Sequence, residues 1–196
     1  MIPPVNHTGD DEAERVLLES FARGEREAFA SIYTRHADAL LSYGAGLGFD
    51  RETLKDALHD IFYKLYATPR LATGVRDVKS YLFRALRNRL INGRRGGQRE
   101  TSLDPTGREF SIEVSIVDAQ IEEEERSRVA TEIERYLNEL TPRQREAIYL
   151  RFIQEFDYDE VARLLDMTPH AARKLVSRAI ATIRDHYPLL VIFFRL

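Results

Sequence analysis

Two stretches of this 196-residue chain contain arginine and lysine but no aspartate or glutamate. The first lies between Asp77 and Glu100, and the second lies between Asp166 and Asp185. Local clusters of positive charge suit contact with phosphate groups, which a neighbouring carboxylate would repel. Although the net charge of the whole chain is −3, this segregation predicts two separate phosphate-binding surfaces.

The second basic stretch falls within a predicted helix-turn-helix. A helix around residues 158–165, a turn at 166–169 and a helix over 170–187 would share an apolar core, with small Ala162 allowing close approach and Met167 filling the turn. The turn has Asp166 where glycine is common, and aspartate tolerates left-handed backbone. The outward face of the second helix suits a DNA major groove. The alternative is an ordinary helical hairpin with a solvated basic face. The residues of the outward face are His170, Ala171, Arg173, Lys174, Ser177 and Arg178.

The first basic stretch falls on the last of four helices predicted for the N-terminal half. Apolar residues at helical spacing predict four helices. The first spans about residues 11–24, and the second runs from there to a glycine-rich end at 44–48. The third runs from the N-cap Asp50 to Pro69, and the fourth spans 77–95. Val16, Leu17 and Phe21 are expected to form the apolar face of the first helix. Together these helices predict one compact helical domain.

The chain changes character after Gly96-Gly97. Residues 110–116 alternate between apolar and polar side chains, which indicates extended backbone, so residues 97–120 are expected to be a linker. A helix over 121–140 follows, and Thr141-Pro142 is a strong start signal for the next helix. We therefore predict an all-α, two-domain protein with domain 1–96, linker 97–120, domain 121–187 and an apolar tail 188–196.

Patterns typical of enzymes and metalloproteins are weak in this chain. His36 with Asp38, or His59 with Asp60, could be imagined as ligands, but neither pair has His-Glu-x-x-His spacing or a third converging ligand. We find no glycine-rich phosphate loop and no nucleophile elbow. The prediction is therefore a protein without catalytic residues, metal or cofactor. The absence of cysteine, of a signal peptide and of a long apolar run favours a soluble, cytoplasmic protein.

Several motifs together resemble the extracytoplasmic-function (ECF) sigma factors of bacterial RNA polymerase. The segment Leu-Thr-Pro-Arg-Gln-Arg-Glu-Ala-Ile-Tyr-Leu-Arg at 140–151, followed by Tyr-Asp-Glu-Val-Ala at 158–162, resembles their region 4. Phe-Ala-Ser-Ile-Tyr at 29–33, Asp-Ala-Leu-His-Asp-Ile-Phe at 56–62 and Tyr-Leu-Phe-Arg-Ala-Leu-Arg-Asn at 81–88 resemble region 2, in the family's order. The resemblance spans about residues 12–187.

The resemblance implies roles for individual residues. The third helix would dock on the clamp of the largest polymerase subunit through Asp56, His59, Asp60 and Phe62. The fourth helix would contact melted −10 DNA through Lys79, Tyr81, Arg84, Arg87, Asn88 and Arg95, with a base pocket in the loop 68–77. The last helix would read the −35 duplex through His170, Arg173, Lys174, Ser177 and Arg178.

The same resemblance implies promoter DNA and core RNA polymerase, its clamp and its flap, as partners. The linker would run toward the polymerase active-site cleft, and the polymerase would supply the chemistry. The tail, with six apolar residues at 189–194, would either cover the region 4 core or bind a partner such as an anti-sigma protein. Two other functions remain open from the residues: a dimeric helix-turn-helix regulator with a sensing domain, and an enzyme with a site around His59 and Asp60.

Overall fold

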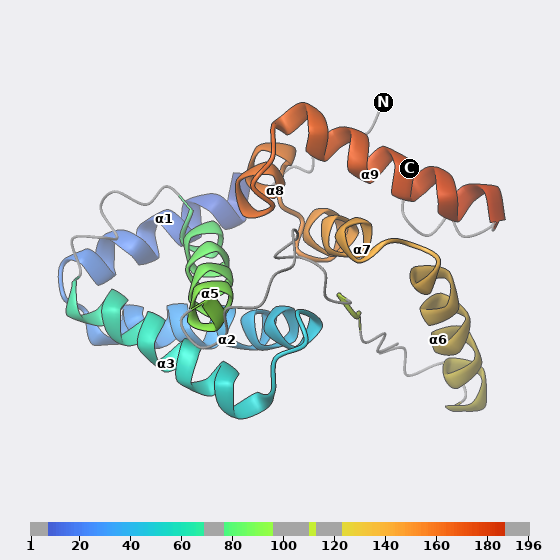
Figure 1. The fold of residues 1–196 in the computed structure, drawn as a ribbon. Helices are drawn as coiled ribbons and strands as arrows, with labels where there is room; N and C mark the ends of the chain where they lie inside the picture. Colours follow the sequence, from blue (N-terminus) through green and yellow to red (C-terminus); the bar gives the residue numbers. More distant parts are fainter. Residues whose placement is uncertain (1–7, 69–76, 96–109, 113–122, 187–196) are drawn as a thin grey trace. The chain divides into compact units, whose positions relative to one another are not determined.

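The computed structural model describes residues 8–68, 77–95, 110–112 and 123–186. The chain divides into two compact units, one of residues 1–45 and 49–103 and the other of residues 46–48 and 104–196. Every regular element in the described ranges is a helix, which confirms the predicted all-α class (Figure 1). Most of the predicted linker, the loop 69–76 and the apolar tail lie outside the described residues.

The first unit contains α1 (Thr8–Ala22), α2 (Arg26–Gly46), α3 (Arg51–Ala67) and α5 (Val78–Arg95). Asp50 is the N-cap of α3, as predicted, because its carboxylate accepts the Thr53 N–H at 2.9 Å. The Asp77 carboxylate accepts the Ser80 N–H at 3.1 Å in the first turn of α5. Local capping chemistry in the sequence therefore sets the start of both helices.

The core of the first unit is aliphatic and aromatic, and α3 packs against α5. The rings of Tyr43 on α2 and Phe83 on α5 lie 5.1 Å apart, and both side chains are fully buried. The predicted apolar face of α1 was partly wrong: Leu18 and Phe21 are buried, but Val16 is 51% exposed. Val16 lies two residues before Leu18, which places it on the opposite side of a helix with 3.6 residues per turn.

Helix α2 continues into the glycine-rich segment and ends at Gly46. A side chain at Gly44 would collide with the methyl groups of Leu54 on α3. Gly44 therefore permits a close approach of α2 and α3. The reversal of chain direction comes later, at Gly48, whose φ of +77° is accessible to glycine.

The second unit contains α6 (Glu123–Asn138), α7 (Pro142–Ile148), the π-helical turn η1 (Tyr149–Ile153), α8 (Tyr158–Leu164) and α9 (Pro169–His186). Thr141 and Gln144 form a capping box at the start of α7, which confirms the predicted start signal. The π-helical turn was not predicted. It forms where the Gln154 N–H reaches the Tyr149 carbonyl at 2.9 Å, five residues back.

Helix α9 packs against α7 and α8, and α8 joins α9 through the tight turn predicted for a helix-turn-helix. Asp166 has φ +51°, the left-handed conformation expected for the residue that stands in place of glycine. The Met167 N–H donates to the Ala162 carbonyl at 3.0 Å and closes the turn. The core shared by the two helices contains Val161, Leu165, Ala172, Val176 and Ala179, which are all buried, while Ile180 is half-buried.

Candidate nucleic-acid interface and docking groove

Helix α9 presents an exposed polar face of the kind that enters a DNA groove. Its opposite side is anchored by the buried residues Ala172, Val176 and Ala179. The first turn contains no acidic residue, so the positive end of the helix dipole is not neutralised there. Of the predicted outward residues, Ala171 is half-buried and the others are exposed, namely His170, Arg173, Lys174, Ser177 and Arg178.

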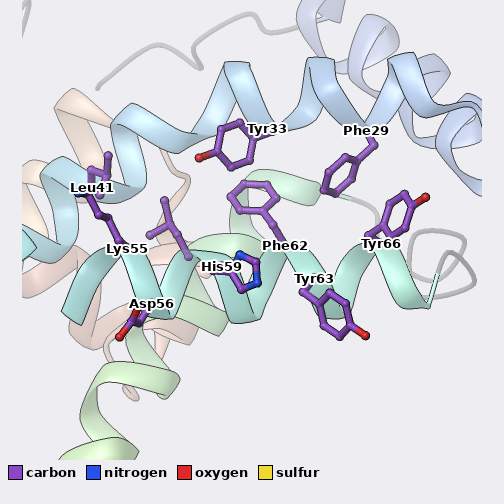
Figure 2. A pocket seen from close by; sticks show the side chains of 10 residues that line it. Phe29, Tyr33, Leu41, Lys55, Asp56, His59, Phe62, Tyr63 and Tyr66 are labelled. Carbon is purple, nitrogen blue, oxygen red and sulfur yellow. The ribbon is translucent and has the colours of Figure 1, made fainter. Parts of the chain in front are cut away.

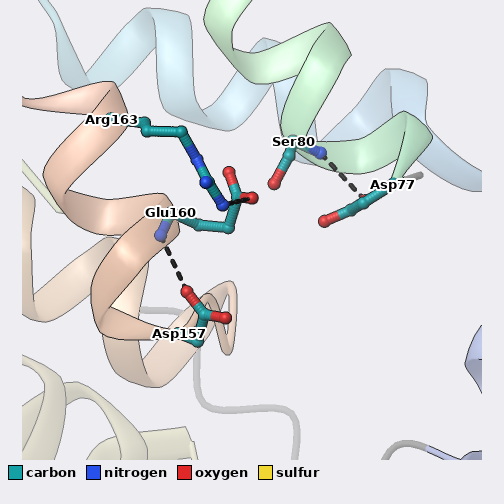
Figure 3. A network of polar contacts seen from close by, with 5 residues as sticks. All are labelled: Asp77, Ser80, Asp157, Glu160 and Arg163. Carbon is teal, nitrogen blue, oxygen red and sulfur yellow. Dashed lines mark hydrogen bonds and ion pairs between the residues drawn. The ribbon is translucent and has the colours of Figure 1, made fainter. Parts of the chain in front are cut away.

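Helix α8 is held in place by interactions at its N-terminal end. The Asp157 carboxylate accepts the Glu160 N–H at 2.7 Å, and Glu160 forms an ion pair with Arg163 one turn later (Figure 3). The next residue after the cap, Tyr158, lies against two arginines. The ζ carbon of Arg173 is 5.0 Å from the centre of the Tyr158 ring, and that of Arg151 is 5.1 Å from it.

The predicted basic face of α5 is divided by the fold. Arg84 and Asn88 are exposed one turn apart, and Tyr81 is half-buried on the same side. Arg87 is only 5% exposed, so its prediction as a DNA contact is corrected: it lies one turn from Phe83 and Leu90, which are both buried, and therefore shares the inward side of the helix. Lys79 is half-buried, and the side chain of Arg95 lies outside the described residues.

A buried polar cluster fixes the start of α5. Glu14 of α1 accepts the backbone N–H of Lys79 at 3.3 Å, so two carboxylates, Glu14 and Asp77, serve the N-terminus of this helix. His36 of α2 is 4% exposed, and its Nε2 lies 3.8 Å from Glu14 Oε1. Burial, with help from the nearby positive charge of Lys79, lowers the pKa of His36 to about 4. Burial and the negative charge of Asp77 raise the pKa of Glu14.

An aromatic groove of about 610 Å³ lies between α2 and α3. The Phe62 ring lies 4.7 Å from the Tyr33 ring and 6.2 Å from the Phe29 ring, while Tyr66 contacts Phe29 at 5.2 Å (Figure 2). Tyr33, Tyr63 and Tyr66 are 46%, 65% and 47% exposed. Exposed aromatic side chains gathered in one groove are typical of protein interaction surfaces.

The residues predicted to bind polymerase occupy different positions relative to this groove. Asp56 and His59 are exposed and line it, whereas Phe62 is buried at its base. Asp60 accepts two hydrogen bonds from Arg89 of α5, at 2.9 and 3.0 Å. Tyr63 and Tyr66 also line the groove and were not predicted. The available signal was their spacing, since Tyr63 lies four residues after His59 and Tyr66 four residues after Phe62 on the same helix.

No helix in the described residues is long and apolar enough to cross a membrane. Within the same ranges, no group of three or more histidine or acidic side chains is placed to hold a metal ion. His36 faces Glu14 in the core, and His59 stacks near Tyr63, with 6.3 Å between the ring centres. The histidine-acid pairs considered in the sequence thus find structural or surface roles in the fold.

Comparison with known proteins identifies both units. Residues 32–100 match the family model for Sigma-70 region 2, and residues 130–183 match that for Sigma-70, region 4. A two-domain helical protein with this pair of regions is a promoter-recognising sigma factor. The chain belongs to the sigma-70 family and has the region content typical of ECF sigma factors, whose domains bind core RNA polymerase and promoter DNA.

Solved structures share this fold. CnrH, solved in complex with the cytosolic domain of CnrY, is 20% identical with a TM-score of 0.56, covering 88% of this chain and 96% of CnrH. RpoE, solved with the anti-sigma factor NepR from Bartonella quintana, is 22% identical with a TM-score of 0.55, covering 82% of this chain and 97% of RpoE. No curated protein sequence matches the chain.

Proposed function

We propose that α9 reads the −35 element of a promoter as duplex DNA. The exposed basic face of α9 is the observation that carries this proposal, because its cations stand on a helix whose other side is locked into the core. Arg173 and Lys174, near the N-terminal end, are assigned to base edges, together with His170 and Ser177. Arg178 is assigned to a phosphate.

Helix α5 is proposed to hold the non-template strand of the melted −10 element. The proposed contact strip consists of half-buried Tyr81 and exposed Arg84 and Asn88, which offer one aromatic ring, one cation and one amide. Single-stranded DNA binds by base stacking on aromatic rings and by phosphate contact with cations, and such contacts offset the cost of unstacking. Lys79 and Arg95 are retained as flanking contacts. Arg87 is not, since its side chain is buried.

The aromatic groove between α2 and α3 is proposed as the docking site for the polymerase clamp. Asp56 and His59 supply polar groups beside it, and Tyr63 supplies an apolar surface that is already exposed in the free protein. Interfaces of this kind draw most of their affinity from a few aromatic residues. Asp60 is assigned a supporting role, in which its contact with Arg89 connects α3 to the DNA-binding helix α5.

The remaining assignments follow from the same function. The chain contributes no catalytic group, metal or cofactor, and phosphodiester chemistry belongs to the polymerase. Domains 1–96 and 121–187 act on the two promoter elements, with the linker 97–120 in the polymerase cleft and the flap near the second domain. The protein works in the cytoplasm. One of the two similar structures was solved with an anti-sigma factor, and the tail 188–196 is one candidate contact for an anti-sigma factor or another recruiting protein.

In-vitro transcription with purified bacterial core polymerase and a pool of promoters from the source genome tests this function. Sequence-selective initiation that depends on the protein is expected. Arg84→Glu should reduce strand opening, measured by permanganate reactivity of unpaired thymines. Arg26→Glu, at another exposed cation of the same unit, should not. Binding to duplex DNA without affinity for core polymerase would support a free-standing helix-turn-helix regulator instead.

The docking groove is tested separately by the affinity of the protein for core polymerase. Tyr63→Ala should weaken binding at least about 5-fold, as expected for truncation of an aromatic hot spot. Because the side chain is 65% exposed, the stability of the unit should change little. Val16→Ala, at an apolar residue 51% exposed on α1, is the matched control. Equal affinity of both variants and wild type would exclude the groove as the docking site.

A further inference from the structure

We propose that Tyr158 is a positioning residue that holds the Arg173 side chain ready for duplex DNA. The inference rests on the proposed function of α9. It gives a role to a residue of α8 that has none in that proposed function. Its basis is the contact of the Arg173 guanidinium with the Tyr158 ring, at 5.0 Å from the ring centre. A guanidinium at this distance is attracted by the negative face of the ring.

The ring itself is fixed from two sides. Tyr158 begins α8 directly after the N-cap Asp157, so its backbone is set by the capping hydrogen bond to Glu160. On η1, Arg151 also approaches the ring, at 5.1 Å, and its Nη1 donates to the Phe156 carbonyl at 3.1 Å. The unpredicted π-helical turn therefore contributes to the DNA-reading helix by bringing Arg151 to the ring. One aromatic side chain thus connects η1, α8 and α9.

This arrangement has a consequence for DNA affinity. A free arginine side chain samples many rotamers and loses that freedom when it binds, whereas a side chain already confined loses less. A contact with an aromatic face also leaves the N–H donors at the edge of the guanidinium available for a base or a phosphate. Tyr158 would therefore increase affinity and selectivity at the DNA position read by Arg173 without touching the DNA.

The test compares variants in the holoenzyme, formed from full-length protein and core polymerase. The probe is a duplex fragment of a promoter that the wild-type holoenzyme transcribes, beside the same fragment with its −35 segment scrambled. Tyr158→Leu should weaken binding to the intact fragment about 2- to 5-fold, the factor that corresponds to the loss of an exposed cation–π contact. Binding to the scrambled fragment should stay the same. Tyr158→Phe, which keeps the ring, should restore wild-type affinity.

A double-mutant cycle with Arg173→Ala separates positioning from a structural role. In the Arg173→Ala background, Tyr158→Leu should cause no further loss, because the side chain that it positions is gone. Phe152→Leu is the matched control, since it makes the same kind of substitution at a ring that contacts Arg151. It should leave the selectivity for the intact fragment unchanged.

The possible failures are distinguishable. If Arg173→Ala has no effect on binding, the assignment of α9 residues to DNA fails, and the positioning role fails with it. If Arg173→Ala weakens binding but Tyr158→Leu does not, or strengthens it by releasing the arginine, only the positioning role is overturned. Additive losses in the double variant would likewise overturn it, because Tyr158 would then act independently of Arg173.

Discussion

The buried histidine of the first unit gives the protein a definite dependence of stability on pH. Burial lowers the pKa of His36 to about 4, and the positive charges of Lys79 and Arg35 act in the same direction against the smaller opposing effect of Asp77. Between pH 6.5 and 4 the unfolded chain therefore binds a proton that the folded unit does not. The contribution of His36 to stability must fall as the pH drops through this window.

The size of the effect follows from the two pKa values. With a pKa of about 6.5 in the unfolded chain and about 4 in the fold, lowering the pH from about 7.5 to about 5 costs about 2 kcal/mol of unfolding free energy. Glu14 acts in the opposite direction. Its pKa is raised, so the folded unit takes up that proton at a higher pH than the unfolded chain does, and this contribution grows as the pH falls.

His36→Gln isolates the histidine from these other groups. The variant should lose about 2 kcal/mol less stability than wild type between about pH 7.5 and about pH 5, although it is itself less stable at neutral pH because a packed side chain is replaced. Urea unfolding followed by circular dichroism gives the free energy. Hydrogen exchange in peptides of α2 restricts the measurement to the first unit.

An exposed histidine of the same unit provides the control. His59→Gln removes a histidine that is exposed on α3, so burial is absent there, and this variant is compared with His36→Gln. If His36→Gln and wild type lost the same stability over this pH range, His36 would ionise in the fold as it does in the unfolded chain. The argument from burial would then be wrong.

Three further predictions concern local structure. Each is measured as a change in the midpoint of urea unfolding of the unit that contains the substituted residue. Glu155→Gly should stabilise the second unit by about 0.5–1 kcal/mol, because φ is +58° at a residue that is neither glycine nor asparagine; a destabilised variant would contradict this. Thr141→Ala should cost about 1 kcal/mol through loss of the capping box, and an unchanged midpoint would show that Gln144 alone satisfies the helix end. Asp60→Ala should cost less than about 1 kcal/mol, since its pair with Arg89 is about half exposed; a larger loss would show that the pair is a structural necessity.

The domain content of this protein was predictable because its signals are local. Capping residues such as Asp50 and Thr141 satisfy backbone groups within three residues of themselves, so the helix starts they predict survive in any tertiary context. The helix-turn-helix was equally predictable, because helical periodicity on both sides of a left-handed turn residue, Asp166, leaves few other ways to bury the apolar faces. The exposed basic face of α9 follows directly from that burial.

Tertiary structure alone decided which side chains are available for function. Arg84 and Arg87 looked equivalent in sequence, but in the fold Arg84 is exposed and Arg87 is buried. Tyr63 and Tyr66 became part of a groove only when α3 brought them beside Phe29 of α2, and Tyr158 met Arg173 only through the turn between α8 and α9. A periodic pattern shows which residues share a helix face. Exposure and contact depend on what packs against that face, and residues far away in the chain supply those packing partners.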